Sequence, residues 1–234
     1  MGSRKRLPIF FCPRLKLHSL CAGQLNYAIF ELMKIICVGR NYADHAKELK
    51  NDIPTEPVIF LKPDSALLKD GKAFYLPDHL GVIHHELEIV LRVCKNGKHI
   101  AEKFAPDYYD QVGLGIDFSA RELQTQLKNK GLPWELAKGF DHSAVLGELR
   151  PKANFDALNM HLELKINGES KQVGNTSDML FPFDKIITFV SRYFSLRQGD
   201  LIYTGTPAGV GPVKIGDELR GYLDGEELLR FEVK

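Results

Sequence analysis

Two glutamates stand close together in the segment I-H-H-E-L-E-I-V-L-R-V, residues 83–93. The alternation of the residues around them predicts a β-strand, in which successive side chains point to opposite faces. Glu86 and Glu88 then share the face opposite His85, roughly 6.5–7 Å apart along the strand, where their carboxylates repel each other. If this face is buried, the pair requires a cation or a shared proton; if it faces water, it requires neither.

A third acid, Asp117, lies in V-G-L-G-I-D-F-S-A-R-E-L-Q, between an expected strand and an expected helix. An acid at this position can serve a turn or stabilise the helix dipole. Alternatively, it completes a three-carboxylate set with Glu86 and Glu88, which suits Mg²⁺, or else Mn²⁺ or Ca²⁺. Three protein ligands would leave positions open for water and substrate, as a catalytic metal requires. The spacing alone leaves both interpretations open.

His45 and Glu48 are three residues apart in G-R-N-Y-A-D-H-A-K-E-L, so on a helix they lie on one face. A carboxylate beside an imidazole orients the ring and raises its basicity, which suits a general base that activates water. An ordinary polar pair on a surface helix has the same pattern.

Lys138, in P-W-E-L-A-K-G-F-D, is by itself compatible with a solvated lysine. The Gly- and Pro-rich segment 204–212 is either a tight turn or a source of backbone N–H groups for a carboxylate.

The composition excludes several classes of protein. A chain of 234 residues can build one sizeable domain, and 44% hydrophobic with 26% charged residues is ordinary for a soluble globular protein. The net charge of +1 gives no electrostatic case for binding nucleic acid or an acidic membrane. No apolar run reaches the roughly 18–20 residues that cross a bilayer. The four cysteines form no C-x-x-C pair, which indicates a reducing compartment.

Residues 1–32 differ from the rest because they are basic and contain no acid before Glu31. Such a composition is compatible with a mitochondrial transit peptide. The alternatives are that translation starts at Met33, with an over-called start or an expression artefact before it, or that the segment is a structural extension. We expect a cytoplasmic protein, or one of the mitochondrial matrix if the segment is a true leader.

From Met33 onward the pattern indicates a β-rich chain. A capping box of Ser119 and Glu122 predicts a helix that ends before Gly131. Asn96-Gly97 and Asn167-Gly168 are typical of hairpin turns. Further helices are expected over 43–50 and 182–194, and strands over 34–38, 57–62, 83–93, 111–116, 158–166 and parts of 201–233. Because strands and helices do not alternate regularly, we expect a β-rich α+β domain and not a doubly wound sheet.

Read together, the segments resemble the fumarylacetoacetate hydrolase family from Met33 to the C-terminus, residues 33–234. The resemblance rests on V-G-R-N-Y-A-D-H, F-L-K-P, H-H-E-L-E, G-x-D-x-S-A-R-x-L-Q, L-P-W-x-L-A-K-G-F-D, N-x-x-x-M-L-F and G-D-L-I-Y-T-G-T-P-x-G-V-G-P. It implies a mixed β-roll or sandwich fold with a few short helices, usually a homodimer, and one Mg²⁺ or Mn²⁺ in each active site.

The resemblance also implies roles for individual residues. Glu86, Glu88 and Asp117 match metal ligands, and His45 with Glu48 matches a dyad that activates water. Lys138 matches a lysine that steadies the developing charge of the substrate. The motifs that line the substrate pocket contain Arg40, Arg121, Gln124 and Thr206.

The implied activity is Mg²⁺-dependent cleavage of the C–C bond of 3-acylpyruvates to pyruvate and a carboxylic acid, with oxaloacetate decarboxylation as a related reaction. A rival within the family is an isomerase or decarboxylase of the 2-hydroxyhepta-2,4-diene-1,7-dioate type. A remote alternative is a non-catalytic, metal-stabilised domain that binds small acids. The expected partner is a small 2-oxo acid, with no nucleic acid and no membrane.

Overall fold

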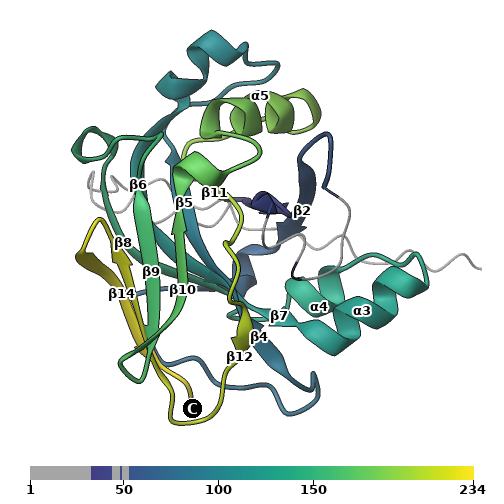
Figure 1. Cartoon of the computed structure of the whole chain (residues 1–234). Coiled ribbons are helices and arrows are strands. Elements are labelled where there is room, and N and C mark those ends of the chain that lie inside the picture. Colours follow the sequence, from purple (N-terminus) through teal and green to yellow (C-terminus); the bar gives the residue numbers. More distant parts are fainter. Residues whose placement is uncertain (1–32, 44–47, 49–52) are drawn as a thin grey trace, which may run out of the picture.

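The computed structural model describes residues 33–43, 48 and 53–234, drawn in colour in Figure 1. The predicted leader 1–32 and most of the predicted helix 43–50, including His45, lie outside the described residues. Among the described helices, none combines the length and apolar content that a bilayer crossing needs.

The largest sheet has seven strands in the order β2-β1-β11-β5-β6-β8-β3. Most neighbours are antiparallel, but β1 pairs with β11, and β3 with β8, in parallel. The bounds are β1 Ile35–Gly39, β2 Val58–Lys62, β3 Leu67–Leu68, β5 Leu87–Val93, β6 Tyr109–Asp117, β8 Ala144–Pro151 and β11 Leu201–Tyr203.

This sheet must curl, because its two edge strands are joined by a very short connection. Only residues 63–66, which include the 3₁₀ turn η1 (Asp64–Ala66), separate the end of β2 from the start of β3. Five residue steps span at most about 18 Å, whereas six strand spacings of a flat sheet would measure about 29 Å. The edges therefore approach each other, and the sheet forms the expected roll.

A second sheet of four antiparallel strands packs on the first, in the order β10-β9-β13-β14. Strand β9 shows the expected alternation, since Leu162, Leu164 and Ile166 are buried in the shared core with Leu114 of β6. The bounds are β9 His161–Ile166, β10 Glu169–Asn175, β13 Glu218–Leu223 and β14 Glu226–Glu232.

Helices and short strands complete the two ends of the molecule. Helix α5 (Phe183–Tyr193) lies across one end, next to the 3₁₀ helix η2 (Glu102–Tyr108). The other two described α-helices lie together beside the small sheet β12-β4-β7 (Figure 1). Their bounds are α3 Arg121–Asn129 and α4 Glu135–Lys138, and the strands are β12 Gly211–Pro212, β4 Ile83–His85 and β7 Ser119–Ala120; single 3₁₀ turns are η3 Lys152–Asn154 and η4 Thr176–Asp178.

Most elements expected from the sequence are confirmed. Strands occur at 35–39, 58–62, 109–117 and 161–166, and four more lie between Leu201 and Glu232. The Asn167-Gly168 turn joins β9 to β10 with both residues at positive φ, 52° and 84°, as a tight hairpin requires. The β-rich α+β class is therefore confirmed, and a doubly wound sheet is excluded.

Three local predictions were wrong. The strand 83–93 is broken at Glu86 into β4 and β5, which belong to different sheets. Asn96-Gly97 is not a two-residue hairpin, because Gly97 bonds to Leu196 and η2 intervenes before β6. Ser119 does not cap a helix: it pairs with His84 in the small sheet, and α3 begins at Arg121 without a side-chain cap.

Gly115 lies in the interior of the large sheet, where there is no room for a larger side chain. A Cβ at this position would lie 2.5 Å from Cε1 of Tyr203 and 2.7 Å from the carbonyl oxygen of Val145. Gly115→Ala should therefore lower the free energy of unfolding by about 1–3 kcal/mol through overpacking, measured by urea denaturation. In the control Gly39→Ala, the added Cβ meets nothing closer than 3.8 Å. Equal stability of the two variants would contradict this packing.

Candidate active site

The three predicted acids converge in the interior of the protein. Glu88 is on β5, Asp117 ends β6, and Glu86 occupies the break between β4 and β5. The amide of Asp117 donates to the carbonyl of Glu86 at 2.9 Å, which aligns the two chain segments. One carboxylate oxygen from each acid lies within 4.8 Å of the others, and all three residues are buried. The face that carries the glutamates is thus a buried one.

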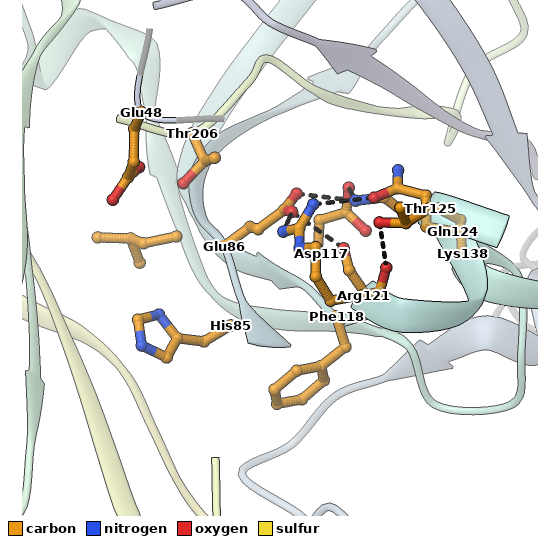
Figure 2. Close-up of polar contacts among 12 residues, drawn as sticks. Glu48, His85, Glu86, Asp117, Phe118, Arg121, Gln124, Thr125, Lys138 and Thr206 are labelled. Atoms are coloured by element: carbon orange, nitrogen blue, oxygen red, sulfur yellow. Dashed lines mark hydrogen bonds and ion pairs between the residues drawn. The ribbon is translucent and has the colours of Figure 1, made fainter. Parts of the chain in front are cut away.

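Cations surround this cluster. Nζ of Lys138 lies 2.8 Å from Oε2 of Glu86 and 2.7 Å from Oδ2 of Asp117. Nζ of Lys62 lies 2.7 Å from the other Asp117 oxygen, and Arg121 forms an ion pair with Glu86. Figure 2 shows Arg121, Gln124 and Lys138 beside Glu86 and Asp117. The charges of the three carboxylates and the three cations cancel. A bound divalent ion would therefore give the cluster two net positive charges, which an anionic substrate could neutralise.

The protonation equilibria reflect this crowding. Burial raises the pKa of Glu88 well above its usual value, and the charges of Asp117 and Glu86 raise it further. The amide of Gly205 donates to Glu88 at 2.8 Å and opposes this shift. Burial alone would lower the pKa of Lys138, but Asp117 and Glu86 raise it well above its usual value. Burial and the neighbouring acids thus disfavour the ionised form of Glu88. A hard divalent cation bound to this carboxylate would favour the ionised form.

Lys62 is a part of the site that sequence reasoning missed. It is 2% exposed, and its ammonium also donates to the carbonyl of Phe118 at 3.1 Å and to the carbonyl and hydroxyl of Ser143 at 2.9 and 3.0 Å. All three of its protons are therefore used within the protein. These bonds fix the ammonium in place, with its positive charge 2.7 Å from Oδ1 of Asp117. The only sequence signal was its place in the F-L-K-P motif.

A small cavity of about 50 Å³ opens beside the acids. It is lined by the three acids, Lys138 and all four residues expected to bind substrate: Arg40, Arg121, Gln124 and Thr206. Sequence reasoning missed Phe60, Lys128 and Trp134, which also line it. For Lys128 a signal existed, because it follows Gln124 by four residues and Arg121 by seven on one helix.

The predicted dyad is only partly described. Glu48 is exposed and is not among the cavity-lining residues; its carboxylate accepts from the amide of Gly209 at 3.2 and 3.3 Å. His45 lies outside the described residues, so its pairing with Glu48 stays a prediction. Segment 204–212 does direct backbone N–H groups at carboxylates, and those carboxylates are Glu88 and Glu48.

Gln172 of β10 ties this loop to the acid-bearing strand. Its amide nitrogen donates to the hydroxyl of Thr206 at 2.8 Å and to the carbonyl of Pro207 at 3.0 Å. Its amide oxygen accepts from the backbone of Leu87 at 2.9 Å and lies 2.9 Å from Nδ1 of His85. This buried glutamine fixes Thr206 at the cavity, and nothing in the sequence singled it out.

A roll-shaped β fold with a buried centre of three carboxylates defines the class of protein. Residues 34–234 match the family model described as fumarylacetoacetate (FAA) hydrolase C-terminal, so the chain belongs to the fumarylacetoacetate hydrolase family and is an enzyme of that family. The mitochondrial oxaloacetate tautomerase FAHD1 of Arabidopsis thaliana is 45% identical over 202 residues, which cover 86% of this chain and 91% of that protein.

Two solved structures are similar in fold and sequence. Fumarylpyruvate hydrolase from Pseudomonas aeruginosa, in complex with Mn²⁺ and pyruvate, has a TM-score of 0.81 and 34% identity, covering 86% of this chain and 89% of that one. The 2-hydroxyhepta-2,4-diene-1,7-dioate isomerase of Mycobacterium marinum has a TM-score of 0.76 and 33% identity, covering 87% and 75%. The acid cluster is of the kind that holds a divalent metal.

The acid cluster generates a prediction about metal binding. Glu88→Gln keeps the size of the side chain but removes its charge, so it should weaken Mn²⁺ binding by more than the roughly 10–100-fold typical of outer-shell changes. Isothermal titration calorimetry measures the affinity, and circular dichroism checks the fold. The matched control is Glu122→Gln, an exposed acid on α3. Unchanged Mn²⁺ affinity in Glu88→Gln would rule out this centre.

Proposed function

We propose that this enzyme interconverts the enol and keto forms of oxaloacetate, with Mg²⁺, or Mn²⁺ in its place, held by Glu86, Glu88 and Asp117. The observation that carries the proposal is the buried ammonium of Lys138 between two of the three acids, at the wall of the cavity. When bound, the metal supplies a Lewis acid and a template for a 2-oxo acid.

Lys138 supplies the fixed positive charge. Tautomerisation moves a proton between C3 and the oxygen on C2, and negative charge develops on that oxygen when C3 loses its proton. A preorganised ammonium at the wall of the cavity stabilises this charge. The charges of Asp117 and Glu86 raise the pKa of Lys138, which favours the ammonium form of the side chain. Gln124 and Thr206 line the same cavity and would orient the substrate.

The choice of oxaloacetate has two supports. The first is that the Arabidopsis relative is named as an oxaloacetate tautomerase. The second is charge: the acid cluster with a bound divalent ion would have two net positive charges, which suit oxaloacetate because it is a dianion. Sequence reasoning placed 3-acylpyruvate cleavage first and oxaloacetate decarboxylation second. All these reactions, and that of the dienedioate isomerase, pass through stabilised negative charge on the same C2 oxygen.

The proposal is tested by following the enol absorbance of oxaloacetate after adding the protein with Mg²⁺, and again with excess EDTA. We expect acceleration that depends on the metal. In Lys138→Met, kcat should fall by about 10²–10³-fold, the usual effect of losing one preorganised charge partner. Mn²⁺ titration of the same variant checks that the centre remains. If wild-type protein with Mg²⁺ does not accelerate the conversion, the proposal is wrong.

A second candidate function is hydrolysis of 3-acylpyruvates. It is favoured by the contact of the Glu48 carboxylate with Gly209, on the loop that also brings Thr206 to the cavity. This contact holds Glu48 against the loop that carries Thr206, and Glu48 together with His45 would deprotonate an attacking water.

The two candidate reactions differ in their need for His45. Hydrolysis requires an activated water. Tautomerisation from enol to keto only exchanges protons, since the C2 hydroxyl can give its proton to solvent while C3 takes one from solvent. His45→Ala should therefore reduce pyruvate release from acetylpyruvate at least about 10-fold more than oxaloacetate tautomerisation, because general-base catalysis contributes roughly 10²–10⁴-fold. An equal loss of both activities would contradict this division of roles.

Of the two locations expected from the sequence, a mitochondrial one is supported by the name of the Arabidopsis relative and by the basic composition of residues 1–32.

A further inference from the structure

Gln172 of β10 is buried although its neighbour in the strand is an exposed apolar residue. Gln172 is 1% exposed, whereas Val173 is 54% exposed. This is the reverse of the usual preference, because an apolar side chain gains from burial and a buried amide requires hydrogen-bond partners. The pairing of β10 with β9 shifts its register between Ser170 and Gln172. Such an irregularity re-aims a side chain, and here it accompanies the inward position of the glutamine.

The loop 204–212 packs directly on this part of β10. Gly174 follows Gln172 by two residues, so the two lie on the same face of the strand. A Cβ added at Gly174 would lie 2.7 Å from Cβ of Pro207, which leaves no room for a side chain there. Gln172 therefore lies at a tightly packed contact between the strand and the loop.

The contacts of the Gln172 amide determine which of its atoms donates. Its oxygen lies 2.9 Å from the backbone nitrogen of Leu87, which can only donate, and its nitrogen lies 3.0 Å from the carbonyl oxygen of Pro207, which can only accept. The two backbone groups thus fix the orientation of the amide. The same oxygen lies 2.9 Å from Nδ1 of His85, so this ring nitrogen carries a proton. The second proton of the amide nitrogen is donated to the hydroxyl oxygen of Thr206 at 2.8 Å.

This orientation decides what the Thr206 hydroxyl can do. A hydroxyl has one proton, and because its oxygen accepts from Gln172, that proton points away from the glutamine. Among the described residues, no acceptor takes this proton. Thr206 is 4% exposed and lines the cavity beside the three acids. A buried hydroxyl proton without an acceptor is unfavourable, so an oxygen of a ligand in the cavity would complete its bonding.

We propose that Gln172 is a positioning residue, which fixes the Thr206 hydroxyl as a hydrogen-bond donor to an anionic oxygen of the substrate. Gln172 does not line the cavity and acts through Thr206. This inference rests on the proposed function, since it takes the acceptor to be a carboxylate or enolate oxygen of a 2-oxo acid. A hydrogen bond to a charged acceptor is stronger than one to a neutral group, and a hydroxyl already turned toward the acceptor needs no reorientation when the substrate binds.

Binding of pyruvate, a small 2-oxo acid, to the Mn²⁺-loaded protein tests the donor role of Thr206 without turnover. Thr206→Val removes the hydroxyl, so pyruvate affinity should fall about 10-fold, the effect of losing one hydrogen bond to a charged group. Thr206→Ser keeps the hydroxyl and should retain most of the affinity. Calorimetric titration measures both. If Thr206→Val binds pyruvate as wild type does, or if wild type does not bind it, the proposal is refuted.

Gln172→Glu tests the positioning role, because it keeps the shape of the side chain and replaces the donor by an acceptor. The Thr206 proton should turn to the new carboxylate, and pyruvate affinity should again fall about 10-fold. Most of this loss should disappear when the same change is made in Thr206→Val, since the two residues act as a pair. Gln172→Met runs the same cycle without added charge, and it replaces Gln172→Glu if that variant does not fold.

Two controls separate positioning from a general effect on the fold. Gln198→Glu makes the same exchange at an exposed position and should leave pyruvate affinity unchanged. Mn²⁺ affinity should not fall in any variant of Gln172. Equal losses of pyruvate affinity in the wild-type and Thr206→Val backgrounds, or no loss in either, would refute the positioning role. The predicted coupling in a protein that does not tautomerise oxaloacetate would support this role and refute the proposed reaction.

Discussion

The repulsion among Glu86, Glu88 and Asp117 is the constraint on which the rest of the site depends. Three carboxylates within 4.8 Å of one another in a buried position are unfavourable unless positive charge surrounds them. The protein supplies it from three separate elements, through Lys62, Lys138 and Arg121. A divalent ion adds charge beyond this balance, and the excess is available to an anionic substrate.

The fold brings these charges together from segments that are far apart in the sequence. The four-residue connection from β2 to β3 forces the large sheet to curl, which brings the edge lysine Lys62 to Asp117 near the opposite edge. The break at Glu86 joins two sheets at the point where the cluster forms, and the 204–212 loop reaches it through the amide of Gly205. Gln172 then fixes Thr206 of the same loop.

The sequence predicted the acid cluster because strand periodicity relates Glu86 to Glu88 and motif order adds Asp117. It missed Lys62, since a lysine at a strand end has the pattern of a solvated residue until the curl of the sheet is known. The capping-box prediction at Ser119 failed for a related reason: strand pairing and the buried Glu86, which accepts from its hydroxyl at 3.0 Å, outweigh a local helix signal. Lys128 could have been found from helical spacing, because it follows Gln124 by four residues on the helix that begins at Arg121.

The central claim is that the three acids hold a divalent metal, and anomalous diffraction from crystals grown with Mn²⁺ tests it most directly. The account predicts one strong anomalous peak bounded by oxygens of Glu86, Glu88 and Asp117, at distances within the roughly 2.0–2.6 Å range of hard cations. No peak at saturating Mn²⁺, with the acids contacted only by lysine and arginine, would contradict it. So would a peak elsewhere that leaves these carboxylates without metal.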